Sequence, residues 1–327
     1  MQLPPDDPRL RPIHLRRELL RAGHTDRSLA RALARGELDR PRRGAYVDGA
    51  TWRAMSAEER YAVVCRAAYR QANTDVVLSH ASALPFAAAP LWGLDLSMVH
   101  LTRDDGLSGR KERGIQRHCG KLLPGDVIES HDLRVMAPTR TALEVTMLGR
   151  TEAALVVVNH FLHHGDTDLD ALRSRYDLSM DHWPNSLATD LVLRLANPLV
   201  ESVAETRTDY FCFARGLPRP VPQFEIRDGG VVVARLDFAF PELGFWIEFD
   251  GRVKYEQHLR PGESPADVVM REKRREEMVR ELTGWRCLRI TWADLASPDD
   301  LERRIRRMMA SIAQERARRQ GPTSAAS

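Results

Sequence analysis

The stretch from Val231 to Asp250 constrains the fold of this chain more than any other part of its sequence. It reads VVVARLDFAF, then PELG, then FWIEFD, which is two apolar runs separated by a four-residue turn. Runs this rich in Val, Ile, Phe and Trp are typical of strands with both faces covered, so we expect a buried β-hairpin. Acidic residues nevertheless interrupt both runs. A carboxylate among such neighbours is costly to bury unless a cation offsets its charge.

Three of these acids should meet on one side of the hairpin. Glu248 and Asp250 lie two residues apart, so their side chains leave the same face of the second strand. The turn sets the first strand alongside and brings Asp237 within reach of that pair. Converging carboxylates repel one another, and a hard divalent cation relieves the repulsion. The spacing therefore predicts a Mg²⁺ site, which Mn²⁺ could also occupy, with Asp237 and Glu248 among its ligands.

The flanking sequence predicts how this hairpin is embedded in a larger α/β domain. Apolar periodicity and capping residues indicate a helix and a strand before the hairpin, and a helix, a strand and a terminal helix after it. We expect these elements at Ser202–Arg215, Gln223–Arg227, 268–282, Trp285–Thr291 and Asp299–Arg318. Only four of the 49 basic residues are lysines. One of them, Lys254, follows Asp250 by four residues, where its compact ammonium group could reach a water or a phosphate beside the metal.

Residues 198–295 resemble the PD-(D/E)XK nuclease superfamily, in the branch related to very-short-patch-repair endonucleases. The likeness rests on ESVAETR in the first helix, on RLDFAFPELGFWIEFDGRVKY, on REKRREEMVRELTGWRCLRITWADL, and on the order of the elements. It implies a restriction-endonuclease-like α/β domain with a central mixed sheet, which we place at 198–320, and a Mg²⁺-dependent endonuclease activity. It also implies that Glu205, Asp237 and Glu248 hold the metal.

This chain departs from the family pattern at one point. The usual E-x-K is replaced by E-x-D, from Glu248 to Asp250, so the role of the catalytic lysine would pass to Lys254. The resemblance places Asp250 and Lys254 in the downstream catalytic stretch. Lys273 is the alternative lysine, and His258 is a further candidate base because the short-patch-repair branch uses a histidine in this stretch.

The first 50 residues concentrate arginine. Between Arg9 and Arg43 there are eleven arginines and four acids, whereas the whole chain has a net charge of +3. Apolar spacing, with Gly23 and Gly36 as helix stops, predicts two short helices followed by a hairpin with a basic tip. The second helix can enter a major groove while the hairpin touches phosphates. The candidate DNA-binding residues are Arg27, Arg31, Arg35, Arg40, Arg42 and Arg43, and all but Arg40 are expected on one exposed face.

The run LLRAGHTDRSLARALARGELDRPRRGAYV resembles the winged helix-turn-helix at the front of AbiEi-type antitoxins, the antitoxin half of type IV toxin–antitoxin pairs. The resemblance implies a winged helix-turn-helix at 1–50 that binds duplex DNA, and it raises the possibility of a toxin partner. The residues alone leave an alternative open, a protein-interaction module whose arginines are merely solvated.

Residues 51–197 read as a mixed α/β middle region. A helix follows Ser56 in a capping-box pattern, and VVLSHASALPFAAAPLWGL and APTRTALEV are similar to the middle region of the same antitoxin-like proteins. We interpret Ser79, His80 and Arg140 as a buried polar cluster with no assigned chemistry. A helix carries His160, His163 and His164, but no carboxylate or cysteine joins them at ligand spacing, which argues against a metal there.

Composition limits the remaining alternatives. Four widely spaced cysteines argue against a disulfide framework and against a structural zinc site. No apolar stretch reaches the roughly 18 residues that a membrane span requires. The start of the chain lacks the apolar core of a signal peptide, so we expect a cytoplasmic protein. Residues 321–327 are expected to form a disordered tail.

Two functions compete on these grounds. The leading hypothesis is a DNA-binding protein with a Mg²⁺-dependent endonuclease domain, acting in defence, DNA repair or a toxin–antitoxin setting. The alternative is a catalytically silent transcriptional regulator or antitoxin that binds its own operator through the winged helix. Both share one expected architecture, which is α+β overall, with a winged helix, a mixed middle region and an α/β nuclease-like domain.

Overall fold

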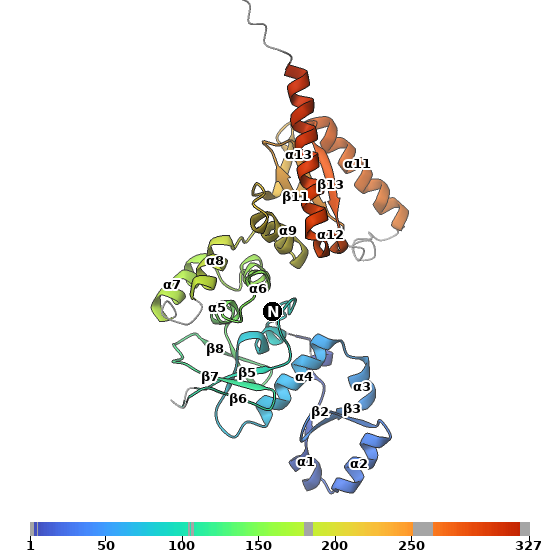
Figure 1. The fold of residues 1–327 in the computed structure, drawn as a ribbon. Helices are drawn as coiled ribbons and strands as arrows, with labels where there is room; N and C mark the ends of the chain where they lie inside the picture. Colours follow the sequence, from blue (N-terminus) through green and yellow to red (C-terminus); the bar gives the residue numbers. More distant parts are fainter. Residues whose placement is uncertain are drawn as a thin grey trace, which may run out of the picture. The chain divides into compact units, whose positions relative to one another are not determined.

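A computed structural model describes residues 3–4, 6–103, 105, 108–179, 186–250 and 264–320 of the chain. They divide into two compact units, Met1–Pro198 and Leu199–Ser327 (Figure 1). Both units combine helices with sheets, so the protein is α+β overall, as predicted. Lys254, His258 and the tail 321–327 lie outside the described residues. Among the helices described, none is both long enough and apolar enough to cross a lipid bilayer.

The first unit begins with the two short helices and the hairpin that the sequence predicts. Helices α1 (Arg16–Arg21) and α2 (Asp26–Ala34) accompany a three-stranded antiparallel sheet in the order β1 (His14–Leu15), β3 (Ala45–Asp48), β2 (Leu38–Arg42). Thr25 caps α2, because its Oγ1 accepts a hydrogen bond of 3.1 Å from the N–H of Ser28. Leu29 is the buried residue of α2, so the arginines of this helix remain on its solvent side.

The middle region of the first unit is built on a six-stranded mixed sheet. Helices α3 (Gly49–Ala54) and α4 (Ala57–Arg70) lead into it, and the predicted capping box of Ser56 begins α4. The strand order is β6-β7-β5-β4-β9-β8. The strands are β4 (Val77–Leu78), β5 (Val99–Arg103), β6 (Arg110–Glu112), β7 (Ile115–Cys119), β8 (Val127–Ser130) and β9 (Leu133–Met136). The remaining helices are η1 (Pro8–Leu10), η2 (His80–Ser82), η3 (Leu84–Ala87), α5 (Pro138–Thr146), α6 (Thr151–His163), α7 (Leu169–Ser179) and α8 (Ser186–Leu195).

The second unit is built on a four-stranded mixed sheet. Its order is β10 (Val221–Asp228), β11 (Val231–Phe240), β12 (Phe245–Phe249), β13 (Arg286–Ile290), with β12 and β13 parallel and the other pairs antiparallel. Gly229 and Gly230 join β10 to β11 with φ of 54° and 87°, and the two-residue turn that suits a twisted hairpin needs positive φ at both positions. Helix α9 (Val203–Ala214) precedes the sheet, α11 (Pro265–Thr283) connects β12 to β13, and α12 (Trp292–Ala296) and α13 (Pro298–Gln320) follow.

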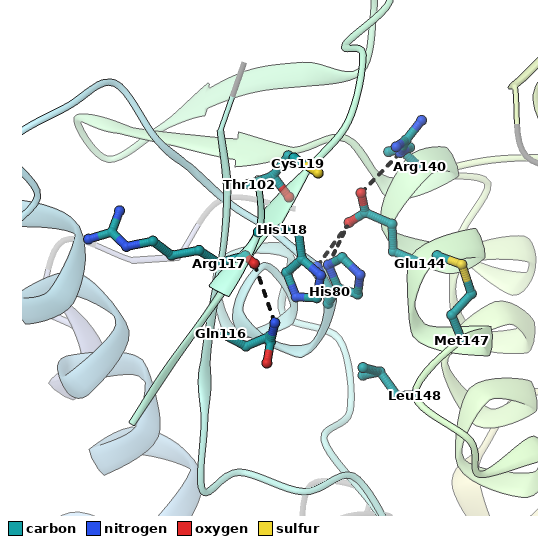
Figure 2. A pocket seen from close by; sticks show the side chains of 11 residues that line it. His80, Thr102, Gln116, Arg117, His118, Cys119, Arg140, Glu144, Met147 and Leu148 are labelled. Atoms are coloured by element: carbon teal, nitrogen blue, oxygen red, sulfur yellow. Dashed lines mark hydrogen bonds and ion pairs between the residues drawn. The ribbon is translucent and has the colours of Figure 1, made fainter. Parts of the chain in front are cut away.

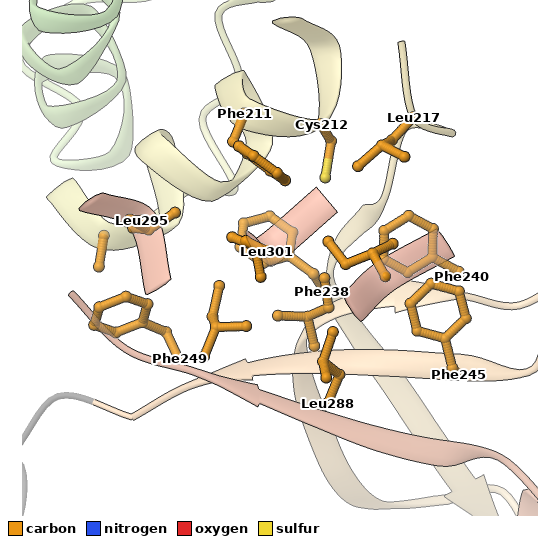
Figure 3. Close-up of a cluster of buried hydrophobic side chains, with 14 of the residues drawn as sticks. Phe211, Cys212, Leu217, Phe238, Phe240, Phe245, Phe249, Leu288, Leu295 and Leu301 are labelled. Atoms are coloured by element: carbon orange, nitrogen blue, oxygen red, sulfur yellow. The ribbon is translucent and has the colours of Figure 1, made fainter. Parts of the chain in front are cut away.

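Two apolar clusters cover opposite faces of this sheet, as the apolar strands predict. On one face, Phe238, Phe240, Phe245, Ile247 and Phe249 pack with Phe211 and Cys212 of α9 and with Leu301 and Ile305 of α13 (Figure 3). On the other face, Leu236, Ala239 and Trp246 pack against Val279 of α11. The sheet therefore lies between α11 and the pair α9 and α13.

Truncation of Phe238 should destabilise the second unit strongly. Phe238 is fully buried in the cluster under α9 and α13, so Phe238→Ala removes apolar contacts and leaves a cavity, at a cost of about 3–5 kcal/mol. Urea unfolding of the full chain measures this loss and shows which transition belongs to the second unit. Phe213, which is exposed on α9, provides the control, because Phe213→Ala should change the same transition by less than about 1 kcal/mol.

Candidate metal site of the second unit

Asp237 sits at an irregularity in the sheet. In β11, Leu236 and Ala239 contact the same apolar cluster, although regular alternation would point residues three apart to opposite faces. The partner strand β10 is irregular at the same level. Gln223 has a φ of +51° there, and it lies between the paired residues Pro222–Phe238 and Phe224–Leu236. Asp237 thus lies where the backbone of two strands departs from the regular pleat. Its Oδ2 accepts a hydrogen bond of 2.9 Å from the N–H of Phe249.

Glu248 lies beside Asp237 on the neighbouring strand. The register pairs Phe238 with Ile247, so Asp237 and Glu248 are the next residues along these two neighbouring strands. Glu248 is only 8% exposed. Burial, followed by the negative charge of Asp237, raises the pKa of Glu248 to about 7. The two acids therefore lie close enough to repel one another.

The side chains of Trp246 and Arg275 bind the carboxylate of Glu248. Its Oε1 accepts a hydrogen bond of 3.0 Å from Trp246 Nε1, and its Oε2 lies 2.9 Å from Arg275 Nη2. Arg275 comes from α11 and is held in place by the carbonyl oxygen of Arg235, which accepts from Nη1 at 2.9 Å. The guanidinium opposes the rise in the pKa of Glu248 without cancelling it. Arg275 thus supplies part of the positive charge that the sequence assigned to a metal ion.

Glu205 of α9 lies near enough to Asp237 for their charges to interact. Its Oε1 accepts from Ser202 Oγ at 2.9 Å, and its Oε2 accepts from the N–H of Glu201 and from Gln223 Nε2, both at 3.1 Å. Burial raises the pKa of Glu205, the hydrogen bond from Glu201 opposes this rise, and the charge of Asp237 adds to it. Glu205 therefore belongs both to the N-terminal cap of α9 and to the electrostatic field of Asp237.

Asp250 and Lys273 lie together on the α11 side of the sheet. Both line a cavity of about 450 Å³, whose other lining residues are Glu272, Glu276, Glu277, Arg280 and Arg289. Glu276 and Arg289 also line the packed space around Glu248, so Glu248 and Asp250 share a face as their spacing predicts. The position of the preferred lysine, Lys254, stays a prediction. Of the candidate lysines, Lys273 is the one that the structure describes, and it lies beside Asp250.

Arg275 and Gln223 also contact the predicted acids, although neither was among the residues predicted from the sequence. Arg275 lies in the run REKRREEM, which reads as a solvated helix, and nothing in its spacing shows that it faces Glu248 across 27 residues. Gln223 opens a predicted strand, and its left-handed backbone is visible only once the strand pairs with β11. The burial of Asp237 and Glu248 was the available signal that some donor must face them.

The predicted DNA-binding arginines are split between two places, which corrects the expectation of one shared face. Arg27, Arg31, Arg35, Arg40 and Arg43 are exposed, but Arg42 is half-buried. Arg42 and Arg43 line a cavity of about 430 Å³ with arginines of the middle region, Arg103, Arg110, Arg113 and Arg117. Residue 42 turns toward the six-stranded sheet because its neighbour in β3, Ala45, packs in the core at that point.

This chain is similar to proteins that have no assigned activity. No family model matches the chain. Two uncharacterized proteins of Mycobacterium tuberculosis, one from strain CDC 1551 and one from strain H37Rv, are each 28% identical over 261 residues, which is 77% of this chain and 88% of each relative. The chain is therefore similar over most of its length to mycobacterial proteins that carry no functional name.

Proposed function

We propose that this protein docks on duplex DNA through its first unit and hydrolyses a phosphodiester bond through its second unit, in a reaction that requires Mg²⁺. The observation that carries the proposal is the placement of Asp237 near both Glu205 and Glu248, where its charge adds to the rise in pKa that burial causes in each. Three carboxylates gathered on partly buried strands and a helix cap form a costly arrangement. A divalent cation offsets that cost, and oxygen ligands suit Mg²⁺ or Mn²⁺.

The donor set fits a hard cation. Within the described part of the chain, Asp237 accepts a single hydrogen bond, at Oδ2. Glu248 and Glu205 would complete the ligands by giving up hydrogen bonds that their oxygens now accept from chain groups. When bound, Mg²⁺ would supply Lewis-acid stabilisation of charge on the phosphate. The chain's own contribution is to hold these carboxylates together and to place Lys273 beside Asp250, where its ammonium group can orient a water or neutralise a phosphate oxygen. Lys254 remains the other candidate for this role.

The ion pair of Glu248 supports a second candidate function. Arg275 already neutralises one of the three carboxylates at 2.9 Å, as a catalytically silent scaffold would require. In that case the protein is a transcriptional regulator or antitoxin that binds its operator, and a toxin partner is compatible with it. Incubation of the full chain with duplex, nicked and single-stranded DNA in Mg²⁺ or Mn²⁺ separates the two functions. Cleavage that EDTA stops supports the nuclease, whereas binding with no cleavage on any substrate supports the regulator.

The cavity between the hairpin and the middle region supports contact with phosphates. Arg103 pairs with Asp105 and Arg110 with Glu112, but no described acid pairs with Arg42 or Arg117. The Nε atoms of Arg42 and Arg117 are buried and lack a hydrogen-bond partner among the described residues. Burial and the positive charge of Arg117 both lower the pKa of Arg42, so the two guanidinium groups lie close together. A phosphate in the cavity that both residues line would offset the repulsion between the two positive charges.

Loss of either arginine should weaken DNA binding and its dependence on salt. In a gel-shift series from low to moderate salt, Arg42→Gln and Arg117→Gln should each reduce affinity several-fold and lower the slope of log K against log salt by about 1, because one phosphate contact is lost. Arg194→Gln, at an exposed position of α8, is the matched control and should behave as wild type. Equal slopes for all four proteins would remove this cavity from the DNA contact.

A further inference from the structure

Three histidines from separate parts of the middle region meet beside a cavity. His80 opens η2, His100 belongs to β5, and His118 belongs to β7. Strands β5 and β7 are parallel, with His100 opposite Gln116 and Thr102 opposite His118, so all four side chains leave one sheet face. His80 is added from η2, and its ring centroid lies 3.8 Å from that of His118 and 5.3 Å from that of His100. We call these three residues the histidine cluster.

The ring nitrogens of the histidine cluster are close enough to share one ion. One ligating nitrogen of each ring lies within 4.8 Å of the other two, and His100 Nδ1 is 2.9 Å from His118 Nε2. Tetrahedral ligands at 2.0–2.1 Å from Zn²⁺ lie roughly 3.3 Å apart. The rings are stacked, so binding requires the ring of His80 to turn. The facing nitrogens of His100 and His118 are already near the required spacing.

The histidines of the cluster are held in the form that binds transition metals. Burial lowers the pKa of His100 and of His118 to about 4, and it lowers the pKa of His80 well below the ordinary value. All three imidazoles are therefore neutral at pH 7. A neutral imidazole can carry its proton on either nitrogen, so the facing atoms of His100 and His118 can both offer lone pairs once the protons occupy the outer nitrogens.

A buried carboxylate fixes the orientation of His80. Glu144 Oε2 lies 3.3 Å from His80 Nδ1 and accepts a hydrogen bond of 3.0 Å from the backbone N–H of the same residue. Arg140 Nε holds the other oxygen of Glu144 at 3.0 Å (Figure 2). Nδ1 of His80 also lies 3.1 Å from Ser79 Oγ. With its proton on Nδ1, between these two polar groups, His80 keeps the lone pair of Nε2 for an ion. A carboxylate behind a histidine in this way is the usual support of a metal-binding imidazole.

The cavity leaves room for a further ligand. Its volume is about 530 Å³, and His80 and His118 line it together with Thr102, Gln116 and Cys119 (Figure 2). Three imidazoles without a carboxylate ligand suit Zn²⁺ rather than Mg²⁺. Three protein ligands plus one position open to a cavity is the arrangement of zinc sites that bind an exchangeable molecule, whereas structural zinc sites have four protein ligands.

We propose that His80, His100 and His118 bind one Zn²⁺ ion in the first unit, with a fourth coordination position that opens into the cavity. The ion joins η2 to strands β5 and β7, and through Glu144 it is linked to α5. The histidines at the C-terminal end of α6, His160, His163 and His164, are not ligands in this proposal. The buried cluster of Ser79, His80 and Arg140 thereby gains a chemical role, in which Ser79 and Glu144 position a ligand.

Metal stoichiometry of the full chain tests this proposal. Protein stripped with a chelator and dialysed is titrated with Zn²⁺ against a chromophoric competitor, and bound metal is counted by mass spectrometry. Wild type should bind one equivalent. His118→Gln and His100→Gln should each lower the affinity at least about a hundred-fold, and Glu144→Gln should lower it 10- to 100-fold because only the orientation of His80 is lost. X-ray absorption at the zinc edge should show three nitrogen neighbours at about 2.0–2.1 Å.

Two control variants separate the histidine cluster from other zinc-binding groups. Cys119→Ser changes a thiol that lines the same cavity, and His164→Gln changes the pair of rings at 4.2 Å on α6. Both should retain one equivalent at wild-type affinity. Less than about a fifth of an equivalent in wild type, or unchanged affinity in both cluster variants, would overturn the proposal. Asp237→Asn should leave Zn²⁺ binding intact. A failure of the proposed nuclease function therefore does not affect the zinc titration, and the two proposals are tested independently.

Discussion

Asp237→Asn should abolish DNA cleavage while leaving the protein folded and bound to DNA. The amide keeps the oxygen that accepts from the N–H of Phe249, but it removes the charge on which the proposed binding of Mg²⁺ depends. We expect the cleavage rate with Mg²⁺ or Mn²⁺ to fall by at least about a hundred-fold, since the lost interaction is worth several kcal/mol in the transition state. Conversion of supercoiled plasmid measures the rate, and gel shifts in EDTA measure the affinity.

The same substitution should make the second unit more stable when no metal is present. Burial raises the pKa of both Glu205 and Glu248, and the charge of Asp237 adds to the rise, so its charge repels theirs in the folded state. Asn at this position relieves that repulsion, and stabilisation by added Mg²⁺ should disappear together with cleavage. Asp228→Asn, at an exposed carboxylate of the same sheet, is the control for both measurements. An Asp237→Asn protein that cleaves at the wild-type rate would exclude Asp237 as a metal ligand.

Glu248→Gln should remove a pH dependence from the stability of the second unit. The pKa of Glu248 is raised from an ordinary value of 4.5 to about 7 in the folded state. Between these pH values the folded protein holds a proton that the unfolded chain has released, so the free energy of unfolding falls as pH rises through this window. Above about pH 7 the contribution is constant. Gln cannot titrate, so the difference between variant and wild type should move in favour of the variant by up to roughly 3 kcal/mol.

Urea unfolding without metal, at pH values between about 5 and 8, measures this difference. The transition to follow is the one that Phe238→Ala shifts. Replacing the carboxylate by an amide beside Trp246 and Arg275 can also lower the free energy of unfolding by a constant amount. That amount cancels, because only the change of the free energy of unfolding with pH is compared. Glu225→Gln, on the exposed side of β10, should track wild type at every pH. Added Mg²⁺ should stabilise wild type more at pH 8 than at pH 5, because the metal binds the ionised carboxylate. A pH-independent difference would show that Glu248 is charged throughout this range.

Much of the second unit could be predicted because its signals are local. The predicted bounds of β11 and β12 agree with those observed, since Asp228-Gly-Gly and Pro241-Glu-Leu-Gly can only turn the chain and the runs between them are apolar. The shared face of Glu248 and Asp250 follows from the two-residue period of a strand. The capped starts of α2, α4 and α9 at Thr25, Ser56 and Ser202 were readable for the same reason.

The partners of these residues could not be predicted, because they come from distant parts of the chain. Arg275 reaches Glu248 from a helix that reads as solvated, and Arg42 turns from the expected DNA face toward Arg117 of the middle region. The histidine cluster is the extreme case, since 38 residues separate His80 from His118 and no spacing rule connects them. Periodicity places a side chain on a face of its own element. It carries no information about which other element covers that face.

Local signals in the sequence were enough to predict the strands and the longer helices of the second unit, their order, and the acids that burial would make costly; the short helix α12 was not predicted. Turn residues, caps and apolar period act over a few residues, so each is legible without a fold. How those acids are compensated depends on the folded chain: Arg275 pairs with Glu248, while burial and the repulsion of Asp237 leave Glu248 with a pKa of about 7. Tertiary structure also decided that three separate histidines lose their charge together. Both outcomes depend on desolvation and on groups brought close by packing, and neither exists until the chain has folded.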